Sequence, residues 1–204
     1  MSIVGLDLAG VETRPSGYCS LENMTVITCL LYADKEILNE IQKVKPEIVA
    51  IDAPLSLPPG RKNINERTSG HLRESDKELL RRGIKFFPIT LGPMRKLTER
   101  GINLRKILES KDFKVLEAYP GGAQDVLGIP RKQQGIENLR AGLEKLGLKG
   151  LSIQMSHHEL DAVTCAYTGK LFLEGKAVIY GASNDGILMP KDELDASPVP
   201  KSFS

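Results

Sequence analysis

The sequence predicts an α/β protein built on a mixed β-sheet flanked by helices. The first sign is an apolar run over residues 3–9 that is interrupted by one carboxylate, Asp7. Two later apolar runs, over residues 48–54 and 115–120, also carry an acid near their end and then reach a proline. Segments with helical periodicity separate these runs, and alternation of strands with helices is typical of a sheet with parallel strands.

Composition limits the organisation of the chain. With 204 residues, of which 41% are hydrophobic, it can bury one core, and we expect one domain over residues 1–190 followed by a flexible tail over 191–204. No apolar stretch approaches the ~20 residues of a membrane span, and no basic leader precedes the first strand. Three widely spaced cysteines favour a reducing compartment. We therefore expect a soluble cytoplasmic protein without a membrane partner.

The first half of the chain reads as a meander and a crossover. Strands are predicted over residues 2–9, 18–21, 25–32 and 47–52. Between the last two, Asp34 is a candidate N-cap of a helix that ends before Pro46. A strand reached through a helix usually runs parallel to the earlier strand and beside it. Asp7 and Asp52 should then be neighbours at the carboxyl edge of the sheet, where open α/β sheets bind ligands.

A basic segment follows the fourth strand. From Arg61 to Lys106 there are 13 Lys and Arg against 5 Asp and Glu, a charge of +8 in a chain whose net charge is +2. Helices are predicted over residues 71–82 and 93–108, and we interpret 55–110 as an inserted basic helical arm. An arm of this charge favours an anionic partner, although a solvated helical face is the commoner explanation. The candidate nucleic-acid contacts are Arg73, Arg81, Arg95, Lys96 and Arg100.

The second half adds one strand, three helices and a hairpin. A fifth strand over residues 113–118 carries Glu117, and helices are expected over 123–127, 136–146 and from about 157. Ser156 and Glu159 match a capping box at the start of the last helix. His158 and Asp161 are three residues apart and share a face of that helix. A C-terminal hairpin is predicted over residues 177–180 and 186–189, with its turn at 184–186.

These residues predict a cation-binding acidic site. Clustered carboxylates repel one another unless cations bind between them, and oxygen-rich clusters suit Mg²⁺ or Mn²⁺. Two such ions are a common means of phosphodiester hydrolysis. The candidate catalytic residues are Asp7, Asp52, Glu117, His158 and Asp161.

Each candidate also has a structural alternative. Asp52 before Ala53 and Pro54 would suit an Asx turn, and Glu117 would orient the loop at Pro120. His158 at a helix start is commonly a surface residue. The positive end of the helix dipole disfavours protonated histidine, so we expect His158 to be neutral near pH 7.

Several motifs resemble a known family, the one called domain of unknown function 429, whose members are regarded as predicted nucleases of RNase H fold. The motifs are residues 5–10 (GLDLAG), 51–54 (IDAP), 73–76 (RESD), 80–84 (LRRGI), 94–98 (MRKLT), 117–120 (EAYP) and 158–162 (HELDA). The last two are also similar to RuvC-type Holliday junction resolvases. That resemblance implies a five-stranded sheet of order 3-2-1-4-5 and Mg²⁺ held by Asp7 and Asp161, with His158 as a further ligand. It also implies an acid at the position of Asp52, where RuvC enzymes usually have Glu.

The expected function is therefore a metal-dependent nuclease that uses a two-metal mechanism on DNA or RNA. One alternative is a catalytically inactive nucleic-acid-binding module. Another is an actin-like or sugar-kinase-like phosphotransferase, although those proteins need a duplicated core and no repeat is visible here. A homodimer is a further expectation about partners.

Overall fold

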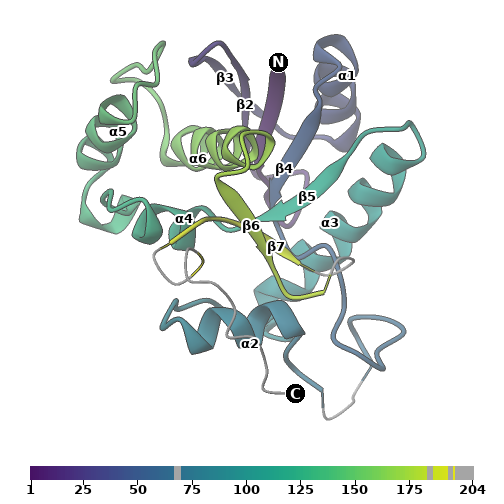
Figure 1. Ribbon diagram of the computed structural model, residues 1–204. Helices are drawn as coiled ribbons and strands as arrows, with labels where there is room; N and C mark the ends of the chain where they lie inside the picture. Colours follow the sequence, from purple (N-terminus) through teal and green to yellow (C-terminus); the bar gives the residue numbers. More distant parts are fainter. Residues whose placement is uncertain (67–69, 183–185, 193–194, 196–204) are drawn as a thin grey trace.

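The computed structural model describes residues 1–66, 70–182, 186–192 and 195 (Figure 1). The strands are β1 (Ser2–Asp7), β2 (Ser16–Glu22), β3 (Thr25–Leu31), β4 (Ile48–Asp52), β5 (Val115–Ala118), β6 (Ala177–Tyr180) and β7 (Ile187–Pro190). The helices are α1 (Asp34–Val44), α2 (Glu74–Arg81), α3 (Gly92–Glu109), α4 (Pro120–Val126), the short 3₁₀ helix η1 (Lys132–Gln134), α5 (Ile136–Lys145) and α6 (His157–Leu173).

The strands form one mixed sheet of order β3-β2-β1-β4-β5-β7-β6. Its first five members have the predicted order, with β1, β4 and β5 parallel and the β2–β3 hairpin antiparallel to β1. The expectation of five strands was wrong, because the C-terminal hairpin joins the sheet. Its strand β7 pairs in parallel with β5, and β6 forms the outer edge. The predicted turn of this hairpin falls mostly on residues 183–185, outside the described part of the chain.

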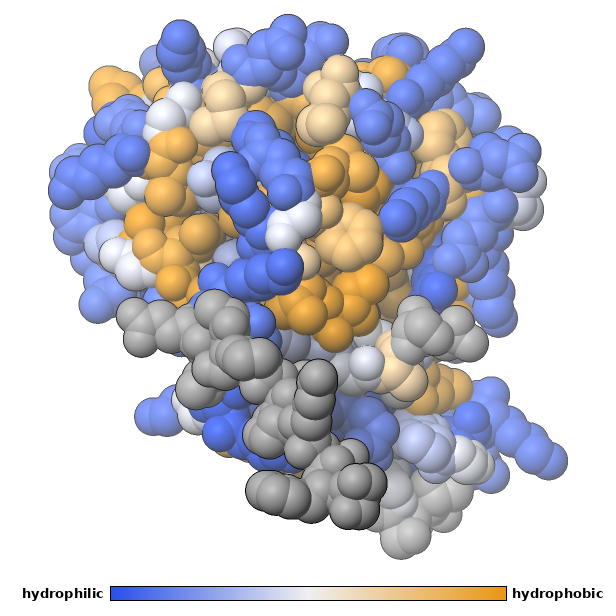
Figure 2. All heavy atoms as spheres, viewed as in Figure 1, coloured by the Kyte–Doolittle hydropathy of each residue, from blue (hydrophilic) through white to orange (hydrophobic). Residues whose placement is uncertain are grey.

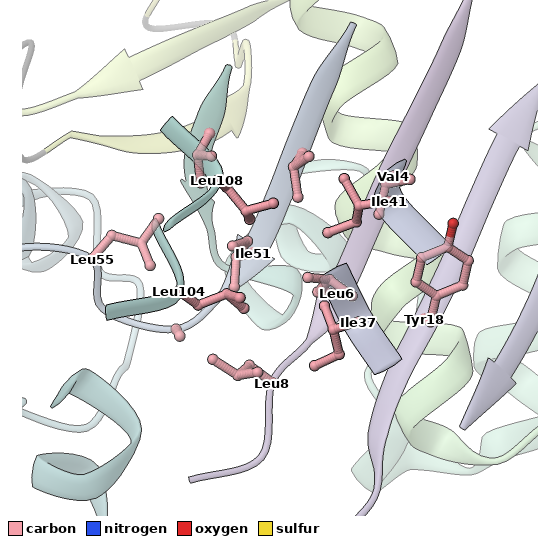
Figure 3. Close-up of a cluster of buried hydrophobic side chains, with 13 residues drawn as sticks. Val4, Leu6, Leu8, Tyr18, Ile37, Ile41, Ile51, Leu55, Leu104 and Leu108 are labelled. Atoms are coloured by element: carbon pink, nitrogen blue, oxygen red, sulfur yellow. The ribbon is translucent and has the colours of Figure 1, made fainter. Parts of the chain in front are cut away.

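Alternation along the strands divides the core between the two faces of the sheet. On one face, Val4, Leu6, Val49 and Ile51 pack against helices α1 and α3 (Figure 3). On the other face, Ile3 and Ile48 pack against helices α5 and α6. Helix α6 crosses the sheet in front of β1 and β4 in the view of Figure 1. Because successive side chains of a strand point to opposite faces, this division decides which face receives each acid.

The start of α1 differs from the prediction. Asp34 is the first helical residue, and Ala33 occupies the N-cap position. The carboxylate of Glu36 accepts hydrogen bonds from the backbone N–H groups of Tyr32 and Ala33 instead. Those bonds hold the pKa of Glu36 below its ordinary value. Asp34 is free for another partner because a residue further along the helix caps its start.

Only part of the predicted basic arm stands apart from the sheet. The C-terminal half of α3 belongs to the central core, where Leu104 and Leu108 are fully buried. Helix α2 packs on the far end of the sheet, where its Leu79 meets Tyr180 and Met189. The segment after β4 therefore covers two parts of the sheet. Helix α3 covers the face that carries Val4 and Leu6, and α2 covers the side edge at β6 and β7.

The predicted flexible tail is described at few positions. Asp192 and Asp195 both accept hydrogen bonds from the guanidinium of Arg82, at 2.8 and 2.7 Å. Residues 193–194 and 196–204, which make up the rest of that prediction, lie outside the described part of the chain. Among the described helices, none has both the length and the apolar composition that crossing a membrane requires. On the face shown in Figure 2, hydrophobic residues gather in the middle, and hydrophilic residues surround them.

Candidate active site

Two of the predicted acids meet at the carboxyl edge of the sheet. Asp7 ends β1, Asp52 ends β4, and the two residues are directly paired in the parallel register. Both have the same strand parity as Ile3 and Ile48, so both side chains lie on the face that α6 covers. The crossover predicted from the sequence therefore brings these carboxylates together.

Two glycines allow α6 to lie close to this edge. A Cβ atom on Gly5 would lie 2.0 Å from the carbonyl oxygen of Ala162, and one on Gly17 would lie 2.0 Å from that of His158. Gly17 is also the register partner of Asp7 on strand β2. Any larger residue at these positions would displace the helix, so the glycines determine how near the first turn of α6 comes to Asp7.

The first turn of α6 carries the other two predicted groups. The capping box is confirmed: the Ser156 hydroxyl accepts from the Glu159 N–H, and the Glu159 carboxylate accepts from the Ser156 N–H at 2.8 Å. With the helix start defined in this way, Nδ1 of His158 lies 2.6 Å from Oδ2 of Asp7. Asp161 is 3% exposed and lies one turn further along the same face.

The expectation about His158 rested on the helix dipole alone, and the contact with Asp7 acts in the opposite direction. The hydrogen bond with Asp7 raises the pKa of His158 above its ordinary value, and burial opposes this effect only in part. A direct bond to a carboxylate at 2.6 Å outweighs the weaker field of the helix dipole. The imidazole of His158 is therefore bound directly to the side chain of Asp7.

Two polar residues that the sequence analysis missed hold Asp161. Its Oδ1 accepts a hydrogen bond from Nε2 of Gln124 on α4 at 2.9 Å, and its Oδ2 accepts one from Nζ of Lys132 on η1 at 2.7 Å. Burial raises the pKa of Asp161, and the positive charge of Lys132 limits the increase. Neither residue belongs to a sequence pattern that predicts function. The one available signal is that Gln124 places a polar amide on the buried face of α4.

Asp52 differs from its neighbours because its carboxylate makes no hydrogen bond or ion pair with any residue that the structure describes. Burial raises the pKa of Asp52 well above its ordinary range, and the charges of Asp7 and Asp161 raise it further. Lys132 reduces this repulsion without contacting Asp52. The cluster thus contains the carboxyl groups of three acids, one amino group and one imidazole.

The donor set of this cluster fits a divalent cation. In the residues that the structure describes, no three His, Cys, Asp or Glu side chains are arranged as a complete metal site. The oxygen-rich composition nevertheless suits Mg²⁺ or Mn²⁺. Within the described ranges, the carboxyl group of Asp52 makes no hydrogen bond or ion pair, and the groups that contact Asp7 and Asp161 are a histidine and a lysine, which can lose a proton or move away. The residues present are therefore compatible with such an ion.

Glu117 does not join the cluster. It has the same strand parity as Val115, which packs with the core on the α3 side, so its side chain points away from Asp7 and Asp52. Its two carboxylate oxygens accept hydrogen bonds from Nη1 and Nη2 of Arg73 at 2.6 and 2.8 Å, and one of them also accepts from the Leu55 N–H at 2.8 Å. Glu117 thus holds the chain after β4 at Leu55, and not the loop at Pro120 that the structural alternative named.

Two of the predicted nucleic-acid contacts, Arg73 and Arg100, are buried. Arg73 is 2% exposed, and besides Glu117 it binds the carboxylate of Asp76. Arg100 is 8% exposed, and its guanidinium binds Asp34 and the carbonyl oxygens of Ala9 and Tyr32. Helical spacing alone did not reveal that loops and strand ends cover these faces. Both guanidinium groups therefore bind other parts of this chain, Arg73 at Glu117 and Asp76 and Arg100 at Asp34 and two carbonyl oxygens.

The remaining predicted cations lie on the surface. Arg81 is exposed but pairs with Glu78 on its own helix. Arg95 is exposed and donates to the carbonyl oxygen of Thr90, while Lys96 next to it is also exposed. Arg95 and Lys96 lie in the first turns of α3, on the turn that also carries Met94. They are the members of the predicted set that stay available for an anionic partner.

A cavity of about 260 Å³ opens beside the acids. Its polar end is lined by Asp52, Asp161 and Lys132. Its other end is formed by apolar and aromatic residues of the segment after β4 and of the turn after β5, among them Phe86, Phe87, Met94 and Tyr119. The cavity therefore joins the ionisable cluster to the inserted segment.

Comparison with known proteins supports the fold. RuvC of Thermus thermophilus in complex with a Holliday junction substrate superposes with a TM-score of 0.52 at 13% identity, over 94% of this chain and 100% of that one. A second structure of Thermus thermophilus RuvC has a TM-score of 0.43 at 16% identity, over 86% and 96%. The similarity to the first of these structures confirms the predicted RNase H-like fold.

No curated protein sequence matches the chain. A family model described as "Protein of unknown function (DUF429)" matches residues 5–185. The match spans most of the sequence, and the chain belongs to the DUF429 family.

Proposed function

We propose that this protein is a nuclease that hydrolyses phosphodiester bonds of nucleic acid with the help of Mg²⁺ or Mn²⁺. The observation that carries the proposal is the convergence of Asp7, Asp52, Asp161 and His158 from two adjacent strand ends and one helix start. The fold similarity to RuvC, which was solved with a Holliday junction substrate, supports it. DNA and RNA are both kept as substrates.

The cation would be held by Asp7, Asp52 and Asp161, with His158 as a further ligand. When bound, one or two such metal ions would activate a water molecule for attack and stabilise the leaving oxygen of the phosphodiester. His158 and the ammonium group of Lys132 contact two of these three acids, Asp7 and Asp161.

The residues of the chain prepare the site for a phosphate. The 2.7 Å bond between Lys132 and Asp161 keeps an ammonium group at the mouth of the cluster. If Asp161 held a cation, the ammonium group of Lys132 would be available to a phosphate oxygen. Gln124 fixes the other oxygen of Asp161 and thereby its orientation. Arg95 and Lys96 on α3 are the proposed contacts of the flanking phosphate backbone, with Arg81 further away on α2.

Glu117 has a positioning role in this proposal. It binds Arg73 and the N–H of Leu55, and Leu55 lies three residues after Asp52. The buried ion pair therefore fixes the chain that leaves β4, and with it the direction of the Asp52 side chain. Replacing Glu117 should lower activity through the position of Asp52, without removing a group that contacts the substrate.

The test is cleavage of end-labelled oligonucleotides by the purified protein. Single-stranded, duplex and branched substrates of DNA and RNA are incubated with Mg²⁺, Mn²⁺ or EDTA. We expect cleavage with the metals and none with EDTA. Asp7→Asn should abolish cleavage because it removes a charge and keeps the side-chain shape. Asp112→Asn is the matched control, since Asp112 is exposed in the turn between α3 and β5, at the opposite end of that strand from the site.

The outcomes separate the proposal from its alternative. Equal cleavage by wild type and Asp7→Asn would show that a contaminant or a different site is responsible. Binding of nucleic acid without cleavage under any metal would favour the inactive binding module. Retained circular dichroism of the Asp7→Asn protein shows that a loss of activity does not come from unfolding.

A further inference from the structure

The cavity beside the acids has an apolar end that the proposed hydrolysis does not use. Phe86, Phe87, Met94 and Tyr119 line this end, while Asp52 and Lys132 line the other. Phosphodiester hydrolysis by carboxylates and a cation requires no aromatic surface. The apolar side chains of this cavity therefore suggest that it binds an apolar part of a ligand.

Phe87 is the most informative lining residue because it is 73% exposed. Its segment between α2 and α3 is held on both sides. Ile84 and Ile89 are buried at 6% and 1% exposure, and the Tyr119 hydroxyl donates to the carbonyl oxygen of Lys85. A large apolar ring is thus presented to solvent by an anchored loop, which favours a surface prepared for a ligand.

Size and charge narrow the class of occupant. At about 260 Å³, the cavity lies just below the ~300–1,000 Å³ typical of small-ligand pockets, so it admits one flat ring system and excludes a duplex. Its lining carries cations beside the acids, since Lys132 and Arg131 both line it and the guanidinium of Arg131 lies 5.8 Å from the centre of the Tyr119 ring. A flat aromatic group that carries a phosphate matches both ends of the cavity.

We propose that the cavity binds one unpaired nucleobase next to the phosphate that is cleaved. The base stacks on Phe87, and its phosphate lies toward Lys132 and the acidic cluster. Aromatic side chains bind bases through their faces, and those faces are accessible only in a single strand or in an extruded nucleotide. The substrate class is therefore nucleic acid with unpaired bases at the cut site. This inference rests on the proposed nuclease function.

The first experiment measures binding and needs no cleavage. A short single-stranded oligonucleotide and its blunt duplex are titrated onto the Asp7→Asn protein in EDTA, and fluorescence anisotropy is recorded. We expect the single strand to bind more tightly. Phe87→Ala in the same background should weaken binding of the single strand by about 5- to 150-fold, the range of one lost stacking contact. Phe87→Trp should preserve it.

A matched control and a minimal ligand complete the test. Ile153 is 82% exposed and does not line the cavity, so Ile153→Ala removes a comparable exposed apolar side chain and should leave binding unchanged. Nucleoside monophosphates should compete with the oligonucleotide better than ribose 5-phosphate, which lacks a base. Equal competition by ribose 5-phosphate, equal binding of duplex, or no effect of Phe87→Ala would each overturn the base site.

The two proposals fail in different ways. If the wild-type protein binds single strands through Phe87 but cleaves none with Mg²⁺ or Mn²⁺, the nuclease function is refuted and the base site remains. If it cleaves and the rate does not depend on Phe87, the base site is refuted and the nuclease function remains.

Discussion

Removing Arg73 should test the corrected role of the inserted segment most directly. Its guanidinium is 2% exposed and is shared by two buried carboxylates, Glu117 at 6% and Asp76 at 1% exposure. In the variant Arg73→Met, both carboxylates lose their cation while the apolar part of the side chain is kept. The two carboxylates are then buried without a counter-charge, so they must either take up protons or be solvated by water that enters the core.

The expected loss is large. Breaking a buried ion pair by removing one partner costs about 3–5 kcal/mol, a substantial part of the roughly 5–15 kcal/mol that stabilises a typical domain. For a chain of this size, that loss corresponds to a decrease in Tm of about 6–20 °C. Thermal unfolding followed by circular dichroism in EDTA measures it. Arg95→Ala, which removes an exposed arginine from α3, should shift Tm by less than about 2 °C.

A second substitution distinguishes lost charge pairing from lost packing. Adding Glu117→Gln to Arg73→Met removes one of the two unpaired charges, so the double variant should be more stable than Arg73→Met alone. The coupling between the two sites follows from a double-mutant cycle. If Arg73→Met unfolds at the wild-type temperature, then the ion pairs of Arg73 do not stabilise the fold and our reason for excluding it as a phosphate contact is lost.

Three further predictions concern the site and its surroundings. Gly17→Ala should reduce cleavage strongly, because the new Cβ would lie 2.0 Å from the carbonyl oxygen of His158, whereas Gly92→Ala meets nothing within 4 Å and should cleave normally. Equal rates would show that the approach of α6 to β2 is unimportant. In EDTA, the Tm difference between wild type and His158→Gln should be greatest below about pH 6.5 and shrink at higher pH, because Asp7 raises the pKa of His158 and this stabilisation is lost as pH rises through the raised value. A difference that grows with pH would contradict the ion pair. Arg95→Ala should reduce the log-log salt dependence of binding to duplex DNA by about 0.9, one phosphate contact, and an unchanged slope would remove Arg95 from the interface.

Local patterns were sufficient for most elements. Apolar runs ending in an acid located β1, β4 and β5, and helical periodicity located α1, α3 and α6, because these signals depend on neighbours within a few residues. The Ser156 and Glu159 spacing predicted the start of α6, which in turn placed His158 and Asp161 on one face. Crossover geometry was enough to bring Asp7 beside Asp52.

The sequence by itself therefore determined the α/β class and the acids Asp7 and Asp52 of the sheet edge, since each follows from short-range periodicity or chain connectivity. The order of the first five strands was implied by the resemblance to RuvC-type resolvases. Only the tertiary structure decided which face each acid occupies and which charges are buried. Glu117 lies next to the end of β5 while Asp52 ends β4, but the register between strands directs Glu117 to the opposite face, where it pairs with Arg73. Lys132 reaches the cluster from η1, which precedes Asp161 by 29 residues in the chain. Strand β7, from the C-terminal part of the chain, pairs with β5. Such contacts depend on packing between distant segments, and no local pattern carries that information.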